Sequence, residues 1–448
     1  MKDKSNVVSS NKPTSDEQVA GNGLLDRRVF LRGTLGGAAL AFAAPLAAAP
    51  RDALFPTQRV PGRPFENYGL PSPHERGVVR WVAATDGVPG NGISWTPLEQ
   101  LDGALTPNGL HFERHHNGIP DIDPALHRLR IAGTVARPLE FDIEALLRYP
   151  RVSRQCFVEC GGNSNAGWRR RPVQTTAGNF HGLVSASEWT GVPLAPLLDQ
   201  AGVDATARWV IAEGADAFSL TMSIPLSKAR DDCLLALFQN GERIRPAQGY
   251  PLRLVVPGWE GVLNVKWLKN LYLSEQPAMA RNETARYTEL MPDGRARQFT
   301  FTMGPKSLIT RPSAQMRLPA PGFYEISGLA WSGHGRVRRV EVSADGGESW
   351  AEAALAEPVL PAALTRFRAP WQWSGQPAVL QSRVTDETGR VQPSRAALLA
   401  ERGRHGYYHY NAIVSWAVAA DGYVTHAYVD TPLETTPLED LFMDDEWD

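Results

Sequence analysis

The interpretation of this sequence depends on the stretch Phe157-Val158-Glu159-Cys160-Gly161-Gly162-Asn163. Its apolar first half predicts a β-strand, and the cysteine at the end of that strand runs directly into a Gly-Gly turn. Glycines in such a turn let a bulky ligand approach the backbone closely, because they carry no Cβ. Cys160 is therefore a candidate soft-metal ligand or nucleophile, although a buried structural thiol is the simpler explanation when the stretch is taken alone.

Two further stretches carry residues that are unusual in their context. Phe112-Glu113-Arg114-His115-His116-Asn117 joins adjacent histidines to an arginine, which suits an anion site or, equally, a surface loop. Gln248-Gly249-Tyr250-Pro251-Leu252-Arg253 brings an arginine into the predicted strand Leu252–Val256. A buried cation needs an anionic partner, which can be a carboxylate or a bound phosphate.

The chain has three cysteines, and an odd, small number cannot form a disulfide framework. We expect Cys156, in polar company, and Cys233, in a run that looks helical, to be structural. Cys156 and Cys160 lie four residues apart and Gly161 follows, so the Cys-x-x-Cys-His motif of covalent c-type haem is absent from the sequence.

The chain has 448 residues, too many for one ordinary core, with 43% hydrophobic and 21% charged residues as in a typical globular protein. A net charge of −2 gives no indication of nucleic-acid binding. Residues 76–305 mix short apolar runs and turns with strands such as Trp267–Leu273 and two helical patches, Glu144–Tyr149 and Pro193–Ala201. This pattern predicts a mixed α+β domain.

The pattern changes in residues 306–430, where short strands recur at regular spacing. They include Tyr324–Trp331, Val337–Ser343 and Val379–Thr385, and Asp345-Gly346-Gly347 is typical of a hairpin turn. Trp371 and Trp373 alternate on one face and are expected in the core. The region is predicted to be a small β-sandwich.

Together these stretches resemble the sulfite oxidase family of molybdopterin enzymes over nearly the whole mature length. Cys160–Asn163 is similar to the family's Cys-x-Gly-Asn, and Phe112–His116 to its Phe-x-Arg-Asn-His. Gly249–Arg253 and Val265–Trp267 are similar to its Gly-x-Pro-x-Arg and Val-Lys-Trp, and Val342–Trp350 to its Val-Ser-x-Asp-Gly-Gly-x-x-Trp. The resemblance implies an α+β fold: a molybdopterin domain followed by an immunoglobulin-like dimerisation domain.

The resemblance also implies a molybdenum–molybdopterin cofactor, with Cys160 as the protein ligand to the metal. Arg253, His116 and Lys266 would bind the pterin phosphate, and Arg114 would point toward the metal and stabilise anionic groups there. The implied cofactor-binding set is Arg114, His115, His116, Cys160, Asp216, Gln248, Arg253, Val265 and Lys266.

Two of the implied residues have a competing explanation. Asp216 resembles an acidic position that hydrogen-bonds the pterin, and it is nearly as well explained as a turn aspartate. Tyr287 stands where the family keeps its active-site tyrosine, which would hydrogen-bond the substrate oxygen and gate proton movement, whereas the alternative is a surface tyrosine.

Within the family, Glu159–Asn163, Arg286–Gly294 and Tyr408–Asn411 look most like the molybdenum subunits of sulfane dehydrogenases. Members that use free sulfite place arginines just after Cys-x-Gly-Asn, but here Ser164-Asn165 follow and Arg169–Arg171 come too late. The resemblance therefore implies oxidation of a sulfane sulfur bound to a carrier protein. Because the chain has no haem motif, the electrons would pass to a separate c-type cytochrome subunit. The alternatives are a sulfite dehydrogenase that uses free sulfite and an inactive binding subunit of a redox complex.

The N-terminal region predicts export. Arg27-Arg28-Val29-Phe30-Leu31 precedes the apolar run Leu35–Pro50, which contains Ala47-Ala48-Ala49. This is typical of a twin-arginine signal peptide over residues 1–49 with cleavage near Ala49. The run is shorter than the roughly 20 residues of a membrane span. We therefore expect a periplasmic protein, exported folded around its cofactor, with residues 50–75 as an extended lead-in.

Residues 431–448 form an acidic tail. Seven carboxylates and no Lys or Arg occur between Glu434 and Asp448, with Leu441, Phe442 and Trp447 among them. A solubilising tail and a docking segment for the cytochrome both fit this pattern. The dimerisation domain in turn predicts a homodimer or hetero-oligomer.

Overall fold

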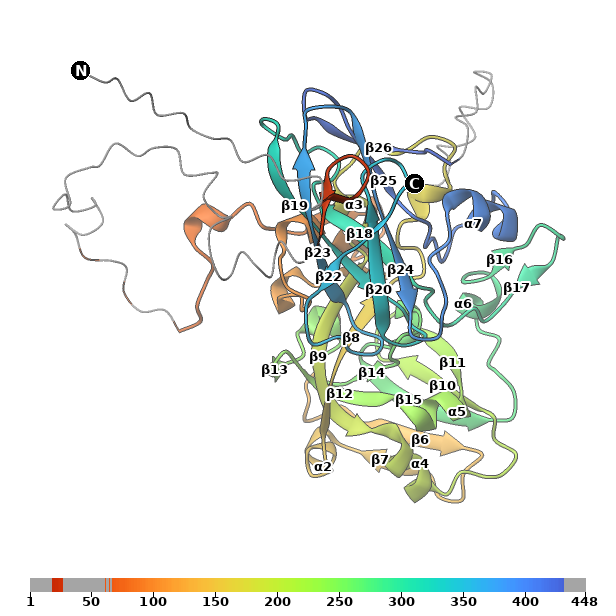
Figure 1. Cartoon of the computed structure of the whole chain (residues 1–448). Coiled ribbons are helices and arrows are strands. Elements are labelled where there is room, and N and C mark those ends of the chain that lie inside the picture. Colours follow the sequence, from red (N-terminus) through yellow and green to blue (C-terminus); the bar gives the residue numbers. More distant parts are fainter. Residues whose placement is uncertain (1–17, 27–60, 62–63, 65–66, 431–448) are drawn as a thin grey trace, which may run out of the picture.

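The computed structural model describes residues 18–26, 61, 64 and 67–430. They form a lower body of sheets with short helices and a β-sandwich above it (Figure 1). The twin-arginine motif, its apolar run, most of the lead-in and the acidic tail lie outside the described residues. Within those residues, none of the helices is both long and apolar enough to cross a membrane.

Two five-stranded sheets and one three-stranded sheet build the lower body. Its strands are β3 (Trp81–Ala84), β4 (Gly92–Trp95), β5 (Glu113–His115), β6 (Leu129–Gly133), β7 (Leu139–Phe141), β8 (Val152–Glu159), β9 (Val184–Pro193), β10 (Trp209–Gly214), β11 (Thr221–Pro225), β12 (Leu234–Gln239), β13 (Glu242–Arg243), β14 (Arg253–Val255) and β15 (Leu268–Ser274). One five-stranded sheet has the order β11-β10-β15-β6-β7, with β15 and β6 parallel. The other has the order β13-β12-β9-β8, with β14 paired to β12, and the small sheet has the order β3-β4-β5.

Short helices connect these strands. They are α2 (Ile143–Leu147), α3 (Ala177–His181), α4 (Leu194–Ala201), α5 (Leu226–Asp231) and α6 (Arg281–Thr284). In α4 the buried residues Leu194, Leu197, Leu198 and Ala201 follow the i, i+3, i+4, i+7 spacing of one helix face. The helix ends at Gly202, which has the left-handed conformation that glycine adopts without strain. The structure confirms the helices expected near residues 144–149 and 193–201.

Cys233 is buried, but the helical run expected around it was wrong, because the residue leads into strand β12. Leu234, Leu235, Ala236 and Leu237 are all buried, so both faces of this strand are covered. A strand buried on both faces has no alternating pattern, and periodicity alone cannot distinguish it from a buried helix. Cys156 is also buried, on β8, so its polar sequence neighbours were misleading about its surroundings.

The sandwich consists of a six-stranded and a five-stranded sheet. Its strands are β1 (Gln18–Ala20), β2 (Leu24–Leu25), β18 (Lys306–Arg311), β19 (Gly322–Trp331), β20 (Val337–Ser343), β21 (Ala351–Glu352), β22 (Ala354–Leu355), β23 (Thr365–Trp373), β24 (Ala378–Asp386), β25 (Ser415–Val418) and β26 (Val424–Ala427). The larger sheet has the order β1-β2-β23-β19-β18, with β22 paired to β23, and the smaller has the order β21-β20-β24-β25-β26. A two-stranded hairpin, β16 (Glu289–Leu290) with β17 (Ala296–Arg297), and helix α7 (Arg395–Arg402) flank the sandwich.

The sandwich core is rich in tryptophan, as the sequence predicted. Trp371 and Trp373 are buried between the sheets together with Trp331 and Trp416. The β20–β21 hairpin closes where Asp345-Gly346-Gly347 predicted a turn. Both glycines there have positive φ, which L-residues rarely adopt.

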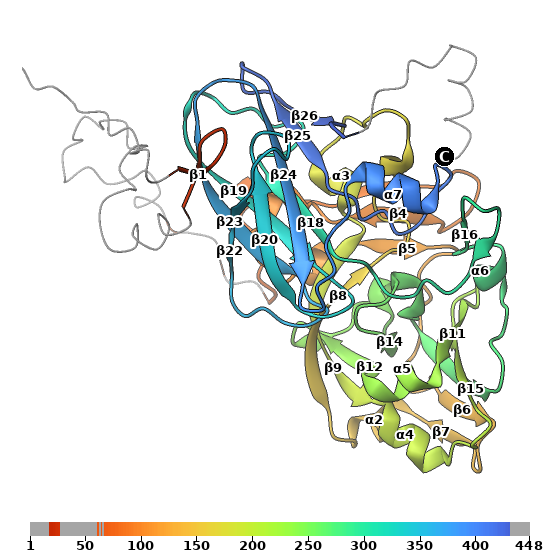
Figure 2. The same ribbon diagram turned by 45° about the vertical axis from the view of Figure 1, so that its right-hand side comes forward.

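The core of the sandwich continues into the lower body. Phe157 of β8 and Phe180 of α3 belong to the same buried cluster as the sandwich tryptophans. The amide of Phe157 also donates to the carbonyl of Ala362, next to β23. Strand β8 therefore lies where the two parts meet (Figure 2), and it ends one residue before Cys160.

Candidate active site

Cys160 follows β8 in a tight turn. Its amide donates to the carbonyl of Leu183 at 2.9 Å, and its carbonyl accepts from the amide of Asn163 at 2.9 Å. The Asn163 side chain closes the turn from the other side: its Nδ2 donates to Glu159 Oε1 at 2.9 Å, and its Oδ1 accepts from the Leu183 amide at 3.1 Å. The thiol is free and lines a cavity. The predicted strand-to-turn placement is confirmed.

Strand β5 supplies the second wall of this cavity, so the loop alternative for Phe112–Asn117 does not hold for its first part. Arg114 lines the cavity and donates through Nη1 to Asn91 Oδ1 at 2.7 Å. His116 lines it too, and its ring stacks on Phe218 with 4.2 Å between centroids. Burial and the nearby cations Arg114 and Lys266 lower the pKa of His116 to about 4.

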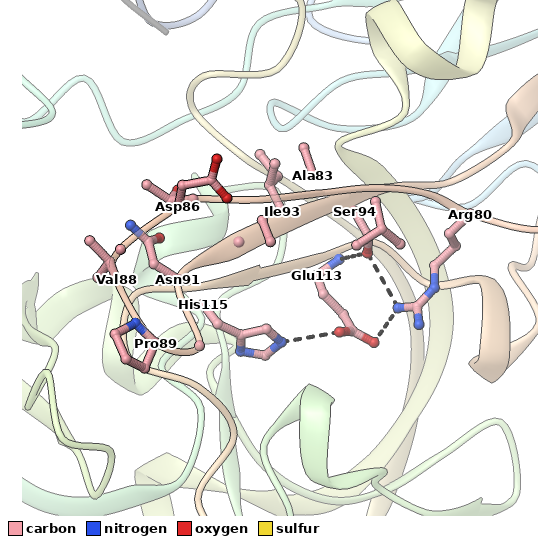
Figure 3. Close-up of a pocket in the computed structure, with 16 residues that line it drawn as sticks. Arg80, Ala83, Asp86, Val88, Pro89, Asn91, Ile93, Ser94, Glu113 and His115 are labelled. Atoms are coloured by element: carbon pink, nitrogen blue, oxygen red, sulfur yellow. Dashed lines mark hydrogen bonds and ion pairs between the residues drawn. The ribbon is translucent and has the colours of Figure 1, made fainter.

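His115, the last residue of β5, lines a neighbouring hollow together with residues of the β3–β4 hairpin (Figure 3). Its Nε2 lies 3.2 Å from Glu113 Oε2, and Glu113 also pairs with Arg80. Burial by itself raises the pKa of Glu113, but the hydrogen bonds from His115 and Arg80 lower it to about 2. This carboxylate is therefore ionised and held by its own partners.

The third wall comes from the segment around Arg253. Arg253 begins β14 and is 4% exposed. Its Nη1 donates to the carbonyl and to Oε1 of Gln248, at 3.1 and 3.0 Å, and Gln248 in turn donates to the carbonyl of Phe112. Gly249 has φ of +110° between them, and a Cβ there would meet Lys266 at 3.0 Å. The close packing of this segment therefore requires glycine.

Lys266 lies between these walls. Its Nζ donates to the carbonyls of Arg114 and Ala247, both at 3.1 Å, and contacts His115 Nδ1 at 2.9 Å. Burial lowers its pKa well below the usual range, and the nearby charge of Arg253 lowers it further.

Two of the predicted residues, Val265 and Asp216, are not among those that line the cavity. Val265 is buried in the core of the lower body, and its carbonyl accepts from the amide of Leu254 at 2.9 Å. Asp216 is buried in the loop beside Lys266, where its Oδ1 caps the amide of Leu220 at 3.4 Å. Its contact is therefore that of a turn aspartate.

Tyr287 covers the cavity above the cysteine turn. It stacks on Tyr408 with 4.8 Å between ring centroids. A Cβ on Gly161 would lie 3.4 Å from Tyr408 and 3.5 Å from Tyr287, so both rings rest against the turn that carries Cys160. Burial raises the pKa of Tyr287 well above its usual range, so its hydroxyl keeps its proton.

The cavity thus brings most of the predicted site residues together. Those that line it are Arg114, His116, Cys160, Gln248, Arg253, Lys266 and Tyr287. They come from five separate segments of the chain.

Comparison with known proteins relates this site to a family. The model of the oxidoreductase molybdopterin-binding domain matches residues 116–282, and that of the Mo-co oxidoreductase dimerisation domain matches residues 297–415. Sulfite oxidase of Gallus gallus is 31% identical over 318 residues, which cover 65% of this chain and 69% of that protein. The chain belongs to the sulfite oxidase family.

Two other relatives show the range of this family. The NADH nitrate reductase of Ulva prolifera is 30% identical over 288 residues, but the chain spans only 33% of its length. The crystal structure of the sulfane dehydrogenase SoxCD from Paracoccus pantotrophus matches with a TM-score of 0.78 at 42% identity. The match covers 88% of this chain and 99% of that chain.

The residues present fit the molybdenum cofactor of the family. Arg253 Nε is buried without a hydrogen-bond partner, and among the described residues no carboxylate pairs with Arg253 or Lys266. Buried cations without anions are costly, and a phosphate would supply the missing charge. Cys160 offers the thiolate that a soft metal prefers.

Sequence reasoning missed two parts of the site. Tyr408 belongs to a stretch that resembles the family, but no role was predicted for it. Its contact with Tyr287 joins residues 121 positions apart, and such a contact leaves no local pattern in the sequence. Sequence reasoning also missed the ion pair of Lys306 with Glu159, whose side chains are 1% and 2% exposed. The available signal was Glu159 itself, a carboxylate directly after the apolar Phe157-Val158 and directly before the cysteine.

Proposed function

We propose that this protein is a periplasmic molybdenum enzyme that oxidises a sulfane sulfur bound to a carrier protein. Its electrons pass to a c-type cytochrome. The similarity to the sulfane dehydrogenase SoxCD carries this proposal, because the match covers 99% of that chain at 42% identity.

The charge of the cavity supports the same substrate. Ser164, where free-sulfite enzymes of the family place an arginine, turns away: its Oγ lies 2.6 Å from His181 Nδ1 and accepts from Lys306 at 2.7 Å. Arg169–Arg171 are exposed and do not line the cavity. Arg114 then remains in the cavity with Cys160 to meet a substrate anion. A sulfur attached to a carrier needs fewer charged partners than free sulfite.

In this proposal each residue of the cavity has its own role. Cys160 would hold the metal, and Arg253, Lys266 and His116 would hold the cofactor phosphate. When bound, the cofactor supplies a two-electron redox centre for oxidation at sulfur. Arg114 would stabilise negative charge beside it. The Tyr287 hydroxyl would donate a hydrogen bond to an oxygen carried by the sulfur as it is oxidised, because its raised pKa keeps it protonated.

Steady-state kinetics of the holoenzyme tests the substrate. We expect kcat/KM for a carrier protein with a cysteine-bound sulfane to exceed that for free sulfite at least about tenfold, a difference of about 1.4 kcal/mol in transition-state binding. Cytochrome c reduction reports both reactions with the same acceptor. Equal or better turnover of free sulfite without a carrier would overturn the substrate assignment.

Free sulfite is the second candidate, because Arg114 faces the cavity and the relatives include enzymes named sulfite oxidase. A binding subunit without catalysis is the third. Metal and pterin analysis of the native protein separates it from both enzymes, since a binding subunit need not hold molybdenum.

Export and assembly complete the proposal. The arginine pair and the Ala47–Ala49 site support twin-arginine export to the periplasm. The dimerisation-domain match at residues 297–415 supports an oligomer, and the acidic tail offers a charged contact for the cytochrome.

A further inference from the structure

A short segment upstream of the twin-arginine motif forms part of the sandwich. Gln18–Ala20 and Leu24–Leu25 make a hairpin, β1–β2, that lies at the outer edge of the sandwich (Figure 2). Leu24 pairs antiparallel with Trp371 of β23 and is 0% exposed. The segment ends just before Arg27-Arg28 in the sequence and lies inside the region that signal cleavage near Ala49 would remove.

The edge of β23 has two halves with different partners. On this edge β22 pairs with the first half, where Ala354 and Leu355 face Arg368 and Phe367. The second half has Leu24 as its partner opposite Trp371, and the amide of Gln372 donates to the carbonyl of Gly23 at 2.8 Å. Without residues 18–25 this half presents unpaired backbone groups, which invite pairing with another strand.

Polar contacts make the fit specific. The indole Nε1 of Trp371 donates to the carbonyl of Asn22 at 2.8 Å, so a buried N–H of the core depends on the segment. The Asn22 side chain donates to the carbonyl of Ala344 at 2.8 Å, and the amide of Gly21 donates to Ser349 Oγ at 2.6 Å. Through these contacts, polar groups of the segment and of the sandwich exchange water for protein partners. Polar groups can be buried without a large cost only when they keep such a hydrogen bond.

Both glycines of the segment lie where an added Cβ would meet the sandwich closely. Gly23 has φ of +88°, and a Cβ there would lie 2.1 Å from the carbonyl oxygen of Gln372. A Cβ on Gly21 would lie 2.1 Å from Asp345 Oδ2. The groove therefore accepts a turn of small residues followed by a buried leucine.

We propose that residues 18–25 are a folding-dependent edge strand of the precursor, which occupies a peptide groove on the sandwich and leaves it when the signal peptide is cleaved. The groove is built from the 344–349 turn and the end of β23, which come together only in the folded domain. Docking therefore holds the segment beside the arginine pair against a sandwich that has already folded. It also covers the open half of β23 until maturation. The change at maturation rests on the proposed export, whereas the docking itself does not.

Hydrogen exchange on the unprocessed full-length chain tests the docking. We expect the amides of residues 21–25 to exchange at least tenfold more slowly than in Leu24→Asp, which places a charge in the buried site. Gly23→Val should release the segment by a different route, through its clash with Gln372. Equal exchange in the wild type and in both variants would refute the docking, whatever the outcome of export.

A synthetic peptide of residues 17–26 tests the groove in trans. It should bind full-length Leu24→Asp, whose own segment is released, and also the processed protein from the periplasm. Quenching or enhancement of tryptophan fluorescence would follow from its contact with Trp371. The same peptide with Gly23→Val should bind at least tenfold more weakly, and unprocessed wild-type protein should not bind either peptide. Failure of the wild-type peptide to bind Leu24→Asp at millimolar concentration would overturn the proposal.

Discussion

Replacing Lys306 by methionine should lower the free energy of unfolding by about 3–5 kcal/mol, the usual cost of removing one partner from a buried ion pair. Lys306 Nζ donates to Glu159 Oε1 at 3.1 Å and to Ser164 Oγ at 2.7 Å. The pair joins β18 of the sandwich to the end of β8, and its side chains are 1% and 2% exposed. The variant would leave the Glu159 carboxylate buried with neutral donors alone.

The remaining donors to Glu159 set the size of this loss. Trp331 Nε1 donates to Oε2 at 2.6 Å and Asn163 Nδ2 to Oε1 at 2.9 Å, so the carboxylate keeps two hydrogen bonds but no cation. Burial lowers the pKa of Lys306 although Glu159 raises it, which indicates that desolvation outweighs the attraction within the pair. The loss therefore comes from the charge left behind, and removing both charges should cost less than the two single changes added together.

Denaturant unfolding, followed by tryptophan fluorescence, measures these differences. Lys269→Met is the matched control, because Lys269 pairs with Glu213 at 2.9 Å but with side chains 35% and 30% exposed. A surface pair of this kind contributes about 0–1 kcal/mol. Glu159→Gln and the double variant complete the cycle.

Because Glu159 precedes Cys160, molybdenum content should fall along with the stability of Lys306→Met. A loss below about 1 kcal/mol for Lys306→Met, or strict additivity in the cycle, would refute the reasoning.

Four further changes test the site and the leader. Cys160→Ser should abolish molybdenum retention and activity with little change in unfolding, because oxygen is a poor match for a soft metal; metal analysis and circular dichroism check this. Arg253→Met should leave the cofactor-free protein as stable as the wild type but weaken pterin retention roughly 10- to 100-fold, since charge-assisted hydrogen bonds contribute about 1.5–3 kcal/mol; unchanged retention in a dialysis assay would contradict the phosphate role. Tyr287→Phe should lower kcat by about 100-fold at unchanged molybdenum content, which is the lower end of the range for residues that transfer a proton in the transition state. A normal kcat would remove Tyr287 from the mechanism. Arg27→Lys with Arg28→Lys should leave precursor in the cytoplasm, and processed protein in a periplasmic extract would show that the motif was misread.

Local pattern was enough to predict much of this protein. Alternating residues over Val337–Ser343 predicted β20 with its bounds, and the spacing in 193–201 predicted α4, because burial of one face imposes a period on each element. The cysteine turn was predicted because a Gly-Gly pair after an apolar strand interrupts the strand and is common in tight turns. The family resemblance then brought in Arg114, Arg253 and Lys266, which the structure places around one cavity.

Where the local sequence pattern gave a wrong or incomplete prediction, the tertiary surroundings of the segment decided its structure. Cys233 leads into a strand and not a helix, because β9 and β14 flank β12 and both its faces are covered. His115 and His116 are neighbours in sequence, yet His116 lines the cavity while His115 contacts Glu113 and Lys266.

The sequence by itself determined strands with an alternating pattern, such as β20, and the turn that carries Cys160, since each depends on neighbours within a few positions. Tertiary structure alone decided the contacts across long separations: Lys306 with Glu159, Tyr287 with Tyr408, and Leu24 with Trp371. Such contacts form because packing removes water from both partners at once, and no local period records which distant partner will be there.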